Sequence, residues 1–201
     1  MTHSLSDVFE LHRKLGHVPF SDVVLASSGH RVIPIDISSP EDMYLIKELD
    51  NSLRTYTKYA SSQYARFHGN RINDVGKNFE NAVLQAIDKS GLSIIKLTKM
   101  GYPDFKLIQE SGNVSYLEIK VSGTKNRAVS SLRSFYYSSP NKIDSDARHL
   151  LLQVRMEEEA DKYWKAISWE VRDLSSLEVQ LKTEFNGGSK EISKTVLIIR
   201  S

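Results

Sequence analysis

The spacing of apolar residues changes near Gly91, and this change limits the folds open to the chain. Before it, Phe79, Val83 and Ile87 recur at four-residue steps, which predicts a helix over about residues 75–89. After it, the period becomes two, as in strands. Three strand-like segments follow one another there: residues 92–97, 104–109 and 113–122. A helix followed by several strands is typical of a sheet with a buried face under helices.

Helices are expected mainly before this point and strands after it. A helix is expected over 5–15, with Ser4 as its cap, and β-prone segments follow at 22–26 and 31–37. A long amphipathic helix is then expected from Ser39-Pro40 to about His68. Further strands are expected at 148–156, 163–172, 177–185 and 195–200. The order predicts an α+β (mixed α/β) fold, with a helical region over 1–72 and a core over 73–201 in one compact unit.

The composition excludes several classes of protein. The chain has 201 residues, of which 40% are hydrophobic and 26% charged, as in ordinary folded domains. It holds no apolar run of roughly eighteen residues and no signal peptide, so a cytoplasmic protein is expected. Because it has no cysteine, disulfides, cysteine nucleophiles and thiolate zinc sites are excluded. The six histidines show no HxH or HxxxH spacing, which argues against a histidine metal site.

One predicted hairpin places two carboxylates opposite each other. If its loop is Glu110-Ser111-Gly112, with glycine in the left-handed position of a three-residue loop, paired residue numbers add up to 222. Asp104 then faces Glu118, and cross-strand partners lie about 4.5–5.5 Å apart at Cβ. Strand alternation places Lys120 beside Glu118 and turns Ile119 toward the core. A two-residue loop would not match the faces, so the geometry depends on the length of this turn.

The paired carboxylates predict a cation site. Two carboxylates this close repel each other unless a cation or a proton lies between them. An oxygen-seeking ion such as Mg²⁺, with Mn²⁺ as a substitute, meets that need, and the Ile119 carbonyl is in range as a third ligand. One or two such ions suit phosphodiester hydrolysis, with Lys120 at the attacking water or the phosphate. The alternative is that Glu118 and Lys120 are only a solvated ion pair, which is common in strands.

A third element extends the pattern. The helix over 75–89 carries GxxFE (residues 76–80), and then come a strand, Pro103-Asp104 and Glu118-x-Lys120 on the next strand. This order resembles the PD-(D/E)xK nuclease superfamily over roughly residues 75–156. The resemblance implies a mixed sheet flanked by helices, metal ligation by Asp104 and Glu118, a catalytic lysine at Lys120, and Glu80 near the metal. Glu80 can equally be a carboxylate on the helix surface.

DNA contacts are expected after the second strand of the hairpin. Residues 119–143 hold five basic residues and no Asp or Glu, although the whole chain has a net charge of only +2. The first candidates for phosphate or base contacts are Lys125, Asn126, Arg127 and Arg133. A solvated basic loop is the alternative. Met43, near the start of the long helix, could be a wedge between base steps, although core or interface packing is favoured.

The resemblance and the elaborations around the core point to a prokaryotic type II restriction endonuclease. Such an enzyme cuts a short palindromic duplex as a homodimer, because a two-fold site is read by a two-fold protein. The helical region over 1–72 would serve DNA binding or dimerisation. Size and composition are also similar to the ThaI-like cutters of short GC sites. The alternatives are a structure-specific repair or Holliday-junction nuclease and a non-catalytic DNA-binding module.

Overall fold

A computed structural model describes most of the chain. The described residues are 4, 6–8, 10, 14, 16–60, 67–70, 72–98, 101–123 and 142–180, with the backbone alone for 56–60, 73 and 77. The helices are α2 (Phe20–Ser28), α3 (Pro40–Ala60) and α4 (Ile72–Asp88), with a short 3₁₀ turn at Ala160–Lys162. The strands are β1 (Val18–Pro19), β2 (Phe67–His68), β3 (Ser93–Lys96), β4 (Phe105–Ile108), β5 (Val114–Gly123), β6 (Arg148–Glu158), β7 (Tyr163–Asp173) and β8 (Glu178–Val179).

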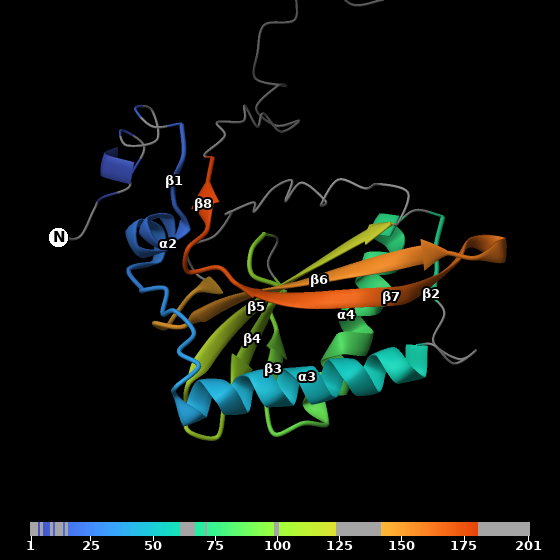
Figure 1. Cartoon of the computed structure of the whole chain (residues 1–201). Coiled ribbons are helices and arrows are strands. Elements are labelled where there is room, and N and C mark those ends of the chain that lie inside the picture. Colours follow the sequence, from blue (N-terminus) through green and yellow to red (C-terminus); the bar gives the residue numbers. More distant parts are fainter. Residues whose placement is uncertain are drawn as a thin grey trace, which may run out of the picture.

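A six-stranded mixed sheet forms the centre of the molecule (Figure 1). Its strand order is β2-β7-β6-β5-β4-β3, and among these described strands β5 and β6 pair in parallel and the other neighbours pair antiparallel. The two-stranded ladder of β1 and β8 lies beside α2. The predicted mixed β-sheet flanked by helices is therefore confirmed.

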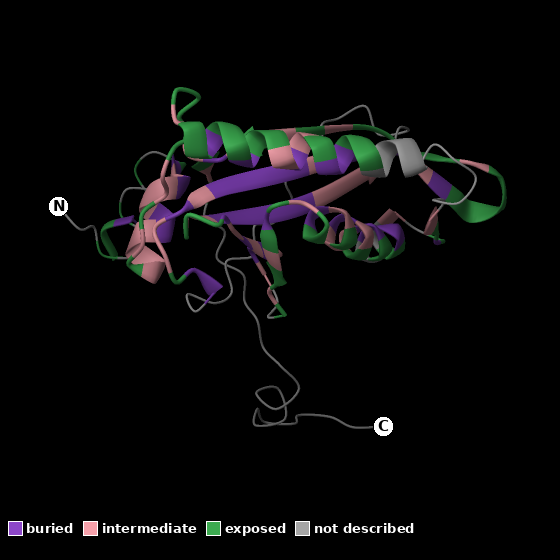
Figure 2. Cartoon of the chain, turned by 90° about the horizontal axis from the view of Figure 1, so that it is seen from below, coloured by how far each residue is buried: buried purple, intermediate pink, exposed green. Residues whose placement is uncertain are grey.

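Helices α3 and α4 cover one face of this sheet. Helix α3 begins as predicted, because the amide of Asp42 donates to the Ser39 hydroxyl at 3.4 Å and Pro40 occupies the first turn. Leu45, Leu49 and Leu53 then point inward at four-residue steps, and all three are buried. They join the apolar residues of α4 and of the inner sheet face in one core cluster. Figure 2 shows the resulting buried layer between α3 and the sheet.

Helix α4 lies very close to β5. A Cβ atom on Gly76 would lie only 3.0 Å from Cγ2 of Val121, so glycine permits this approach. Phe79, Val83 and Ile87 continue the same buried stripe along α4, as the sequence predicted. The glycine of the GxxFE segment is thus explained by close packing of the helix on the strand that carries Glu118 and Lys120.

A second, smaller cluster lies on the opposite face of the sheet. It joins α2, the Tyr102 turn, the even-numbered side of β5 and the segment over 142–147. Tyr102 and Tyr116 are its largest fully buried side chains. Because β5 alternates, this is also the face on which Glu118 and Lys120 lie.

Three local predictions need correction. The segment over 22–26 is helical, because a helix directs Phe20, Val23 and Val24 to one buried side and ends at Gly29 with φ +79°. The segment over 31–37 forms only an isolated parallel bridge between Val32 and Ala147. The long helix was expected to reach His68, but residues 67–68 form strand β2 against β7.

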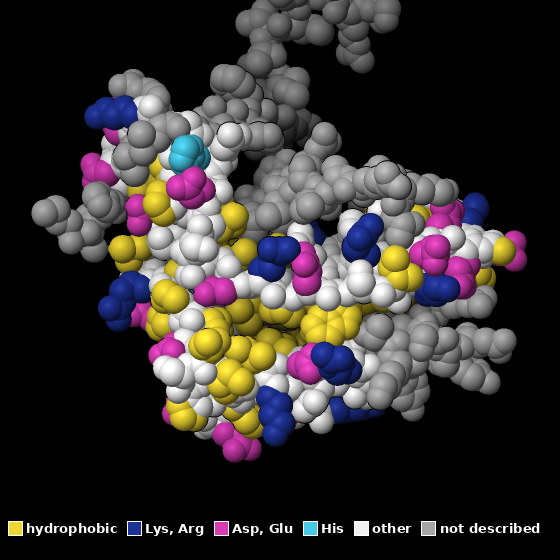
Figure 3. All heavy atoms as spheres, in the orientation of Figure 1, with side chains coloured by type: hydrophobic (Ala, Val, Ile, Leu, Met, Phe, Trp, Pro, Cys, Tyr) yellow, Lys and Arg dark blue, Asp and Glu magenta, His cyan; other side chains and the backbone are white. Residues whose placement is uncertain are grey.

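The ends of the chain are described only in part. The cap expected at Ser4 is confirmed, because the Asp7 amide donates to the Ser4 hydroxyl at 3.2 Å. The strand expected at 195–200 and most of the one at 177–185 lie outside the described residues. Among the residues that are described, no helix is long and apolar enough to cross a membrane. Figure 3 shows apolar side chains gathered in a recess between α3 and β7, with charged side chains around it.

Candidate active site

The turn between β4 and β5 has the predicted length. The Gln109 amide donates to the Asn113 carbonyl at 3.0 Å, and Gly112 has φ +84°, the left-handed conformation that the loop requires. The register runs from Ile108 opposite Val114 to Phe105 opposite Leu117, so each pair adds up to 222 as expected. The paired register ends at Phe105 and Leu117; its extension by one step would set Asp104 against Glu118, whose pKa the charge of Asp104 raises.

The start of β4 is fixed by hydrogen bonds on three sides of Asp104. Its amide donates to the Leu117 carbonyl at 3.2 Å, and its carbonyl accepts from the Leu97 amide at 2.8 Å. Its carboxylate oxygen Oδ2 accepts from the Ile119 amide at 2.8 Å. The side chain is therefore directed at the backbone next to Glu118, where the hairpin geometry placed it.

Glu118 and Lys120 form an ion pair on the same face of β5. The Glu118 side chain is only 4% exposed and that of Lys120 is 30% exposed. The ammonium of Lys120 contacts Oε1 of Glu118, while Oε2 is buried without a hydrogen-bond partner. An orphaned carboxylate oxygen in such a place is costly unless a proton or a cation reaches it.

Burial and, after it, the negative charge of Asp104 raise the pKa of Glu118 to about 7. The positive charge of Lys120 acts in the opposite direction but only partly offsets these effects. A raised pKa of this kind, with a specific charged partner, is common at catalytic centres. Glu118 therefore titrates near neutral pH rather than in the usual range of a glutamate.

The donor set fits a hard divalent cation. Mg²⁺ prefers oxygen ligands and is usually bound through one or two carboxylates plus substrate phosphates and water. The buried free oxygen of Glu118 and the adjacent carboxylate of Asp104 match that preference. No group of three His, Cys, Asp or Glu side chains that could hold a metal is found among the described residues. The two carboxylates would therefore need oxygen ligands from the backbone, solvent or substrate, such as the Ile119 carbonyl.

A second lysine, which the sequence did not single out as a site residue, lies at the same place. The ammonium of Lys142 donates to the Pro103 carbonyl at 2.7 Å and also to the Gly101 carbonyl, and the residue is buried. Desolvation lowers the pKa of Lys142, while the charges of Asp104 and Glu118 act to raise it. Lys142 is thus a buried cation that holds the turn leading into Asp104.

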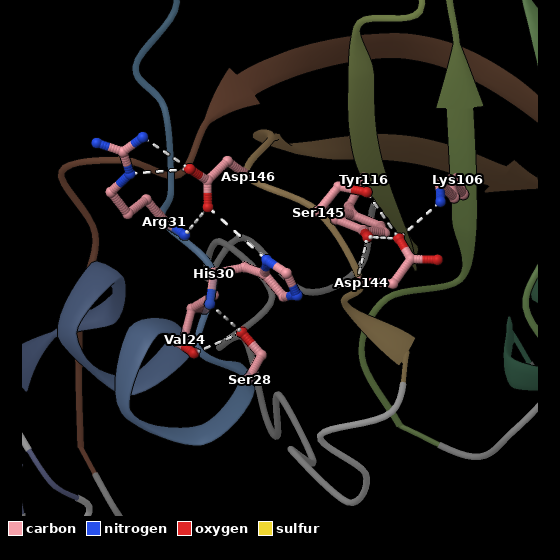
Figure 4. Close-up of polar contacts among 9 residues, drawn as sticks. All are labelled: Val24, Ser28, His30, Arg31, Lys106, Tyr116, Asp144, Ser145 and Asp146. Atoms are coloured by element: carbon pink, nitrogen blue, oxygen red, sulfur yellow. Dashed lines mark hydrogen bonds and ion pairs between the residues drawn. The ribbon is translucent and has the colours of Figure 1, made fainter.

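The segment that carries Lys142 is clamped to the sheet (Figure 4). Asp144 accepts a hydrogen bond from the Tyr116 hydroxyl of β5 at 2.8 Å and pairs with Lys106 of β4 at 2.6 Å. The backbone amide of Asp144 in turn donates to the Tyr116 hydroxyl at 2.8 Å. These contacts lower the pKa of Asp144 to about 2, with the Lys106 hydrogen bond as the largest cause. Two neighbouring strands therefore fix this segment beside the site.

An aromatic layer supports the same turn from behind. The Tyr102 hydroxyl lies 2.6 Å from Nδ1 of His149 at the start of β6, and the two rings are stacked. Phe20 of α2 meets both rings edge-on. Burial lowers the pKa of His149 to about 4, so the imidazole is neutral at physiological pH. The turn before Asp104 is held between this layer and Lys142.

The remaining predicted site residues are not brought to this cluster by the described contacts. Glu80 lies on α4, on the other side of the sheet, and pairs with Lys96 of β3 at 3.2 Å. Met43 is 45% exposed near the start of α3, where the Glu41 carbonyl accepts from Gln109 at the hairpin end remote from Asp104. Four predicted DNA-contact residues lie outside the described part of the chain: Lys125, Asn126, Arg127 and Arg133.

Comparison with known proteins gives two findings. Residues 14–195 match the family described as "Type II restriction enzyme MjaV family". The type II restriction enzyme MjaV of Methanocaldococcus jannaschii is 32% identical over 208 residues, an alignment that covers 90% of this chain and 87% of that protein. The family match therefore includes the whole hairpin with Asp104, Glu118 and Lys120. The expected likeness to ThaI-like enzymes stays a prediction.

Proposed function

Because the chain belongs to the type II restriction enzyme MjaV family, we propose that it is a Mg²⁺-dependent endonuclease with a PD-(D/E)xK site formed by Asp104, Glu118 and Lys120. The observation that carries this proposal is the cluster at the start of the hairpin. Two carboxylates lie together there, one with a buried free oxygen, and a lysine contacts the other oxygen. That combination suits the hydrolysis of a phosphodiester.

Asp104 and Glu118 are the proposed cation ligands, with the Ile119 carbonyl as a further ligand. A bound Mg²⁺ supplies charge neutralisation at the phosphate and lowers the pKa of bound water. Asp104 is kept in place by the Ile119 amide, so its carboxylate needs little rearrangement on binding. Glu118, whose pKa is raised to about 7, would have to be ionised to serve as a ligand.

Lys120 would act on the reacting groups. It now contacts Glu118 but remains 30% exposed, so its ammonium can turn from the carboxylate toward solvent. Turned away from Glu118, the ammonium would reach the attacking water or a phosphate oxygen. Its charge there would stabilise the negative charge that develops in the transition state.

The substrate would be a short palindromic site in duplex DNA, cut by a homodimer. A two-fold protein reads a two-fold site, and each subunit then cuts one strand. The basic segment over 119–143, with Lys125, Asn126, Arg127 and Arg133, remains our proposal for contacts to phosphates and bases. The region over 1–72, with Met43 exposed on α3, remains the proposed site of further DNA contacts or of dimerisation.

Glu80 stays a candidate of lower rank. Its ion pair with Lys96 favours a role in holding α4 to β3 over a role at the cation. A conservative change to glutamine at Glu80 would separate the two roles: loss of cleavage at unchanged stability supports the catalytic role, and reduced stability at unchanged cleavage supports the structural one.

The proposal is tested by incubating the purified chain with plasmid DNA and Mg²⁺. Discrete fragments that disappear with EDTA are expected. Cleavage restricted to four-way junctions would favour the repair or junction nuclease, and binding without cleavage in Mg²⁺ or Mn²⁺ would favour a non-catalytic module. Sequencing the fragment ends would give the recognition site and the stagger, and its two-fold symmetry would test the homodimer.

A further inference from the structure

We propose that Lys142 is a positioning residue of the cleavage site: its ammonium fixes the turn over 101–103 and thereby sets the Asp104 carboxylate against Glu118. The inference rests on the proposed function for its catalytic consequence, but its structural part stands on contacts alone. It concerns a residue thirty-eight positions from Asp104 in the sequence, on a segment of its own.

The contacts of Lys142 converge on the backbone directly before Asp104. Its Nζ donates to the carbonyls of Gly101 and Pro103, which enclose Tyr102 between them. Asp104 follows Pro103 at once, and there the chain enters β4. A displaced turn would therefore move the Asp104 carboxylate directly, since no flexible residue separates the two.

Because Lys142 is buried, its ammonium needs hydrogen-bond acceptors within the protein. Moving an ammonium out of water is unfavourable unless it is paired and hydrogen-bonded. Here two carbonyls accept from it, and the carboxylates of Asp104 and Glu118 lie close enough for their charges to act on it. An apolar side chain of the same length would leave both carbonyls without this donor and would remove a positive charge from the carboxylate pair.

The clamp on the neighbouring residues explains how Lys142 is held in place. Asp144, two residues on, is tied to Tyr116 of β5 and Lys106 of β4. Ile143 between them is buried in the cluster beneath the turn. The lysine is thus presented by a segment that is itself fixed to both strands of the catalytic hairpin, which is what a positioning group needs.

The test begins with Lys142→Met, which keeps the length of the side chain and removes the ammonium. Lys165→Met is the matched control, because Lys165 is a half-exposed lysine on β7 that pairs with Glu157 and Glu159 near the tip of the β6–β7 hairpin. Hydrogen exchange is read at the Asp104 amide, which bonds to Leu117, and at the Leu97 amide, which bonds to Asp104. We expect about tenfold faster exchange at both amides in Lys142→Met and no change in their exchange rate in the control.

The catalytic readout is single-turnover cleavage at saturating Mg²⁺, measured together with the dissociation constant for DNA in Ca²⁺. A misplacement of about 1 Å at a reacting group can cost around 100-fold in rate, so a loss of that order is expected for Lys142→Met with DNA affinity unchanged. A variant that had only lost stability would weaken binding and cleavage together at the temperature where it unfolds, and thermal unfolding identifies that case.

Chemical restoration separates the ammonium from the rest of the side chain. Since the chain has no cysteine, Lys142→Cys can be aminoethylated at a single sulfur while unfolded and then refolded, giving a side chain nearly isosteric with lysine. The aminoethylated protein should recover slow exchange and most of the cleavage rate, whereas carbamidomethylation should recover neither. Wild-type chain carried through the same steps controls for refolding.

The outcomes are distinct. Wild-type exchange and wild-type cleavage in Lys142→Met would overturn the inference and leave the proposed function intact. If the wild-type chain cleaves no DNA, the proposed function fails, and exchange at Asp104 alone then decides whether Lys142 fixes the turn. Equal restoration by the charged and the neutral adduct would also overturn the inference, because the ammonium would then be dispensable.

Discussion

Replacement of Glu118 by glutamine should change how stability depends on pH in the metal-free protein. The pKa of Glu118 is raised from 4.5 to about 7. Between these values the folded protein keeps a proton that the unfolded chain has lost, so stability falls as pH rises through this window. A difference of about 2.5 pKa units corresponds to about 3 kcal/mol, and Glu118 is buried enough for little of it to be screened.

His149 produces the opposite slope in nearly the same window. Its pKa is lowered from 6.5 to about 4, so here the unfolded chain binds the extra proton and stability rises with pH by about 3 kcal/mol. The contributions of Glu118 and His149 therefore offset each other in the wild-type protein between pH 4 and pH 7.5. Glu118→Gln removes the falling term, so the variant should gain about 3 kcal/mol relative to wild type over this range.

Urea unfolding in EDTA at several pH values measures this difference. Glu157→Gln is the matched control, because Glu157 is an exposed glutamate of β6 near the tip of the β6–β7 hairpin. Its unfolding free energy should depend on pH as that of the wild type does. Added Mg²⁺ should stabilise the wild type at pH 7.5, by about 2.7 kcal/mol at one hundred times its dissociation constant, and should not stabilise Glu118→Gln. Parallel curves for wild type and Glu118→Gln from pH 4 to pH 7.5 would refute the reasoning.

Further predictions concern the elements that place the site. Gly112→Ala forces a Cβ into the left-handed region at φ +84° with open space around it, so urea unfolding should show a loss of about 1 kcal/mol, with Gly112→Asn less affected. Asp42 is fully buried, and its Oδ1 forms an ion pair with Nε of Arg148 at 2.8 Å, although the geometry is not that of a hydrogen bond. Asp42→Ala should lower the free energy of unfolding by about 3 kcal/mol. An unchanged midpoint of urea unfolding would contradict the pairing. Tyr116→Phe removes the hydroxyl that holds Asp144, so the pKa of Asp144 measured by NMR should rise from about 2.

The hairpin could be predicted because short-range rules determine it. The length of the loop, the left-handed glycine at its third position and the two-residue alternation are all local, and they set Asp104 against Glu118. The same holds for α3 and α4, whose caps and apolar stripes lie within each segment. Local rules sufficed wherever the interacting residues are neighbours on one element or one turn.

The failures occur where distant parts of the chain decide the outcome. The run Val23-Val24-Leu25 has strand-like composition, yet α2 forms because a helix buries Phe20 and Val24 against the Tyr102 turn. Phe67 belongs to a strand because it pairs with Trp164, almost a hundred residues later. Lys142 could be noticed only as one of several basic residues, because its role depends on Asp144 reaching Tyr116 and Lys106. A signal was present in the sequence for α2, since Gly29 follows its last turn as helix-ending glycines do.

The most direct test of the cleavage site compares the single-turnover rate of Asp104→Asn with that of the wild-type chain on duplex DNA in Mg²⁺. Asparagine keeps an oxygen for the Ile119 amide, so the hairpin and DNA binding should be preserved. With Asp161→Asn on the β6–β7 turn as the control, we expect discrete fragments from the wild type and the control and at least a thousandfold slower cleavage by Asp104→Asn, about 4 kcal/mol at the barrier. Cleavage by Asp104→Asn at the wild-type rate would show that Asp104 does not belong to the cleavage site.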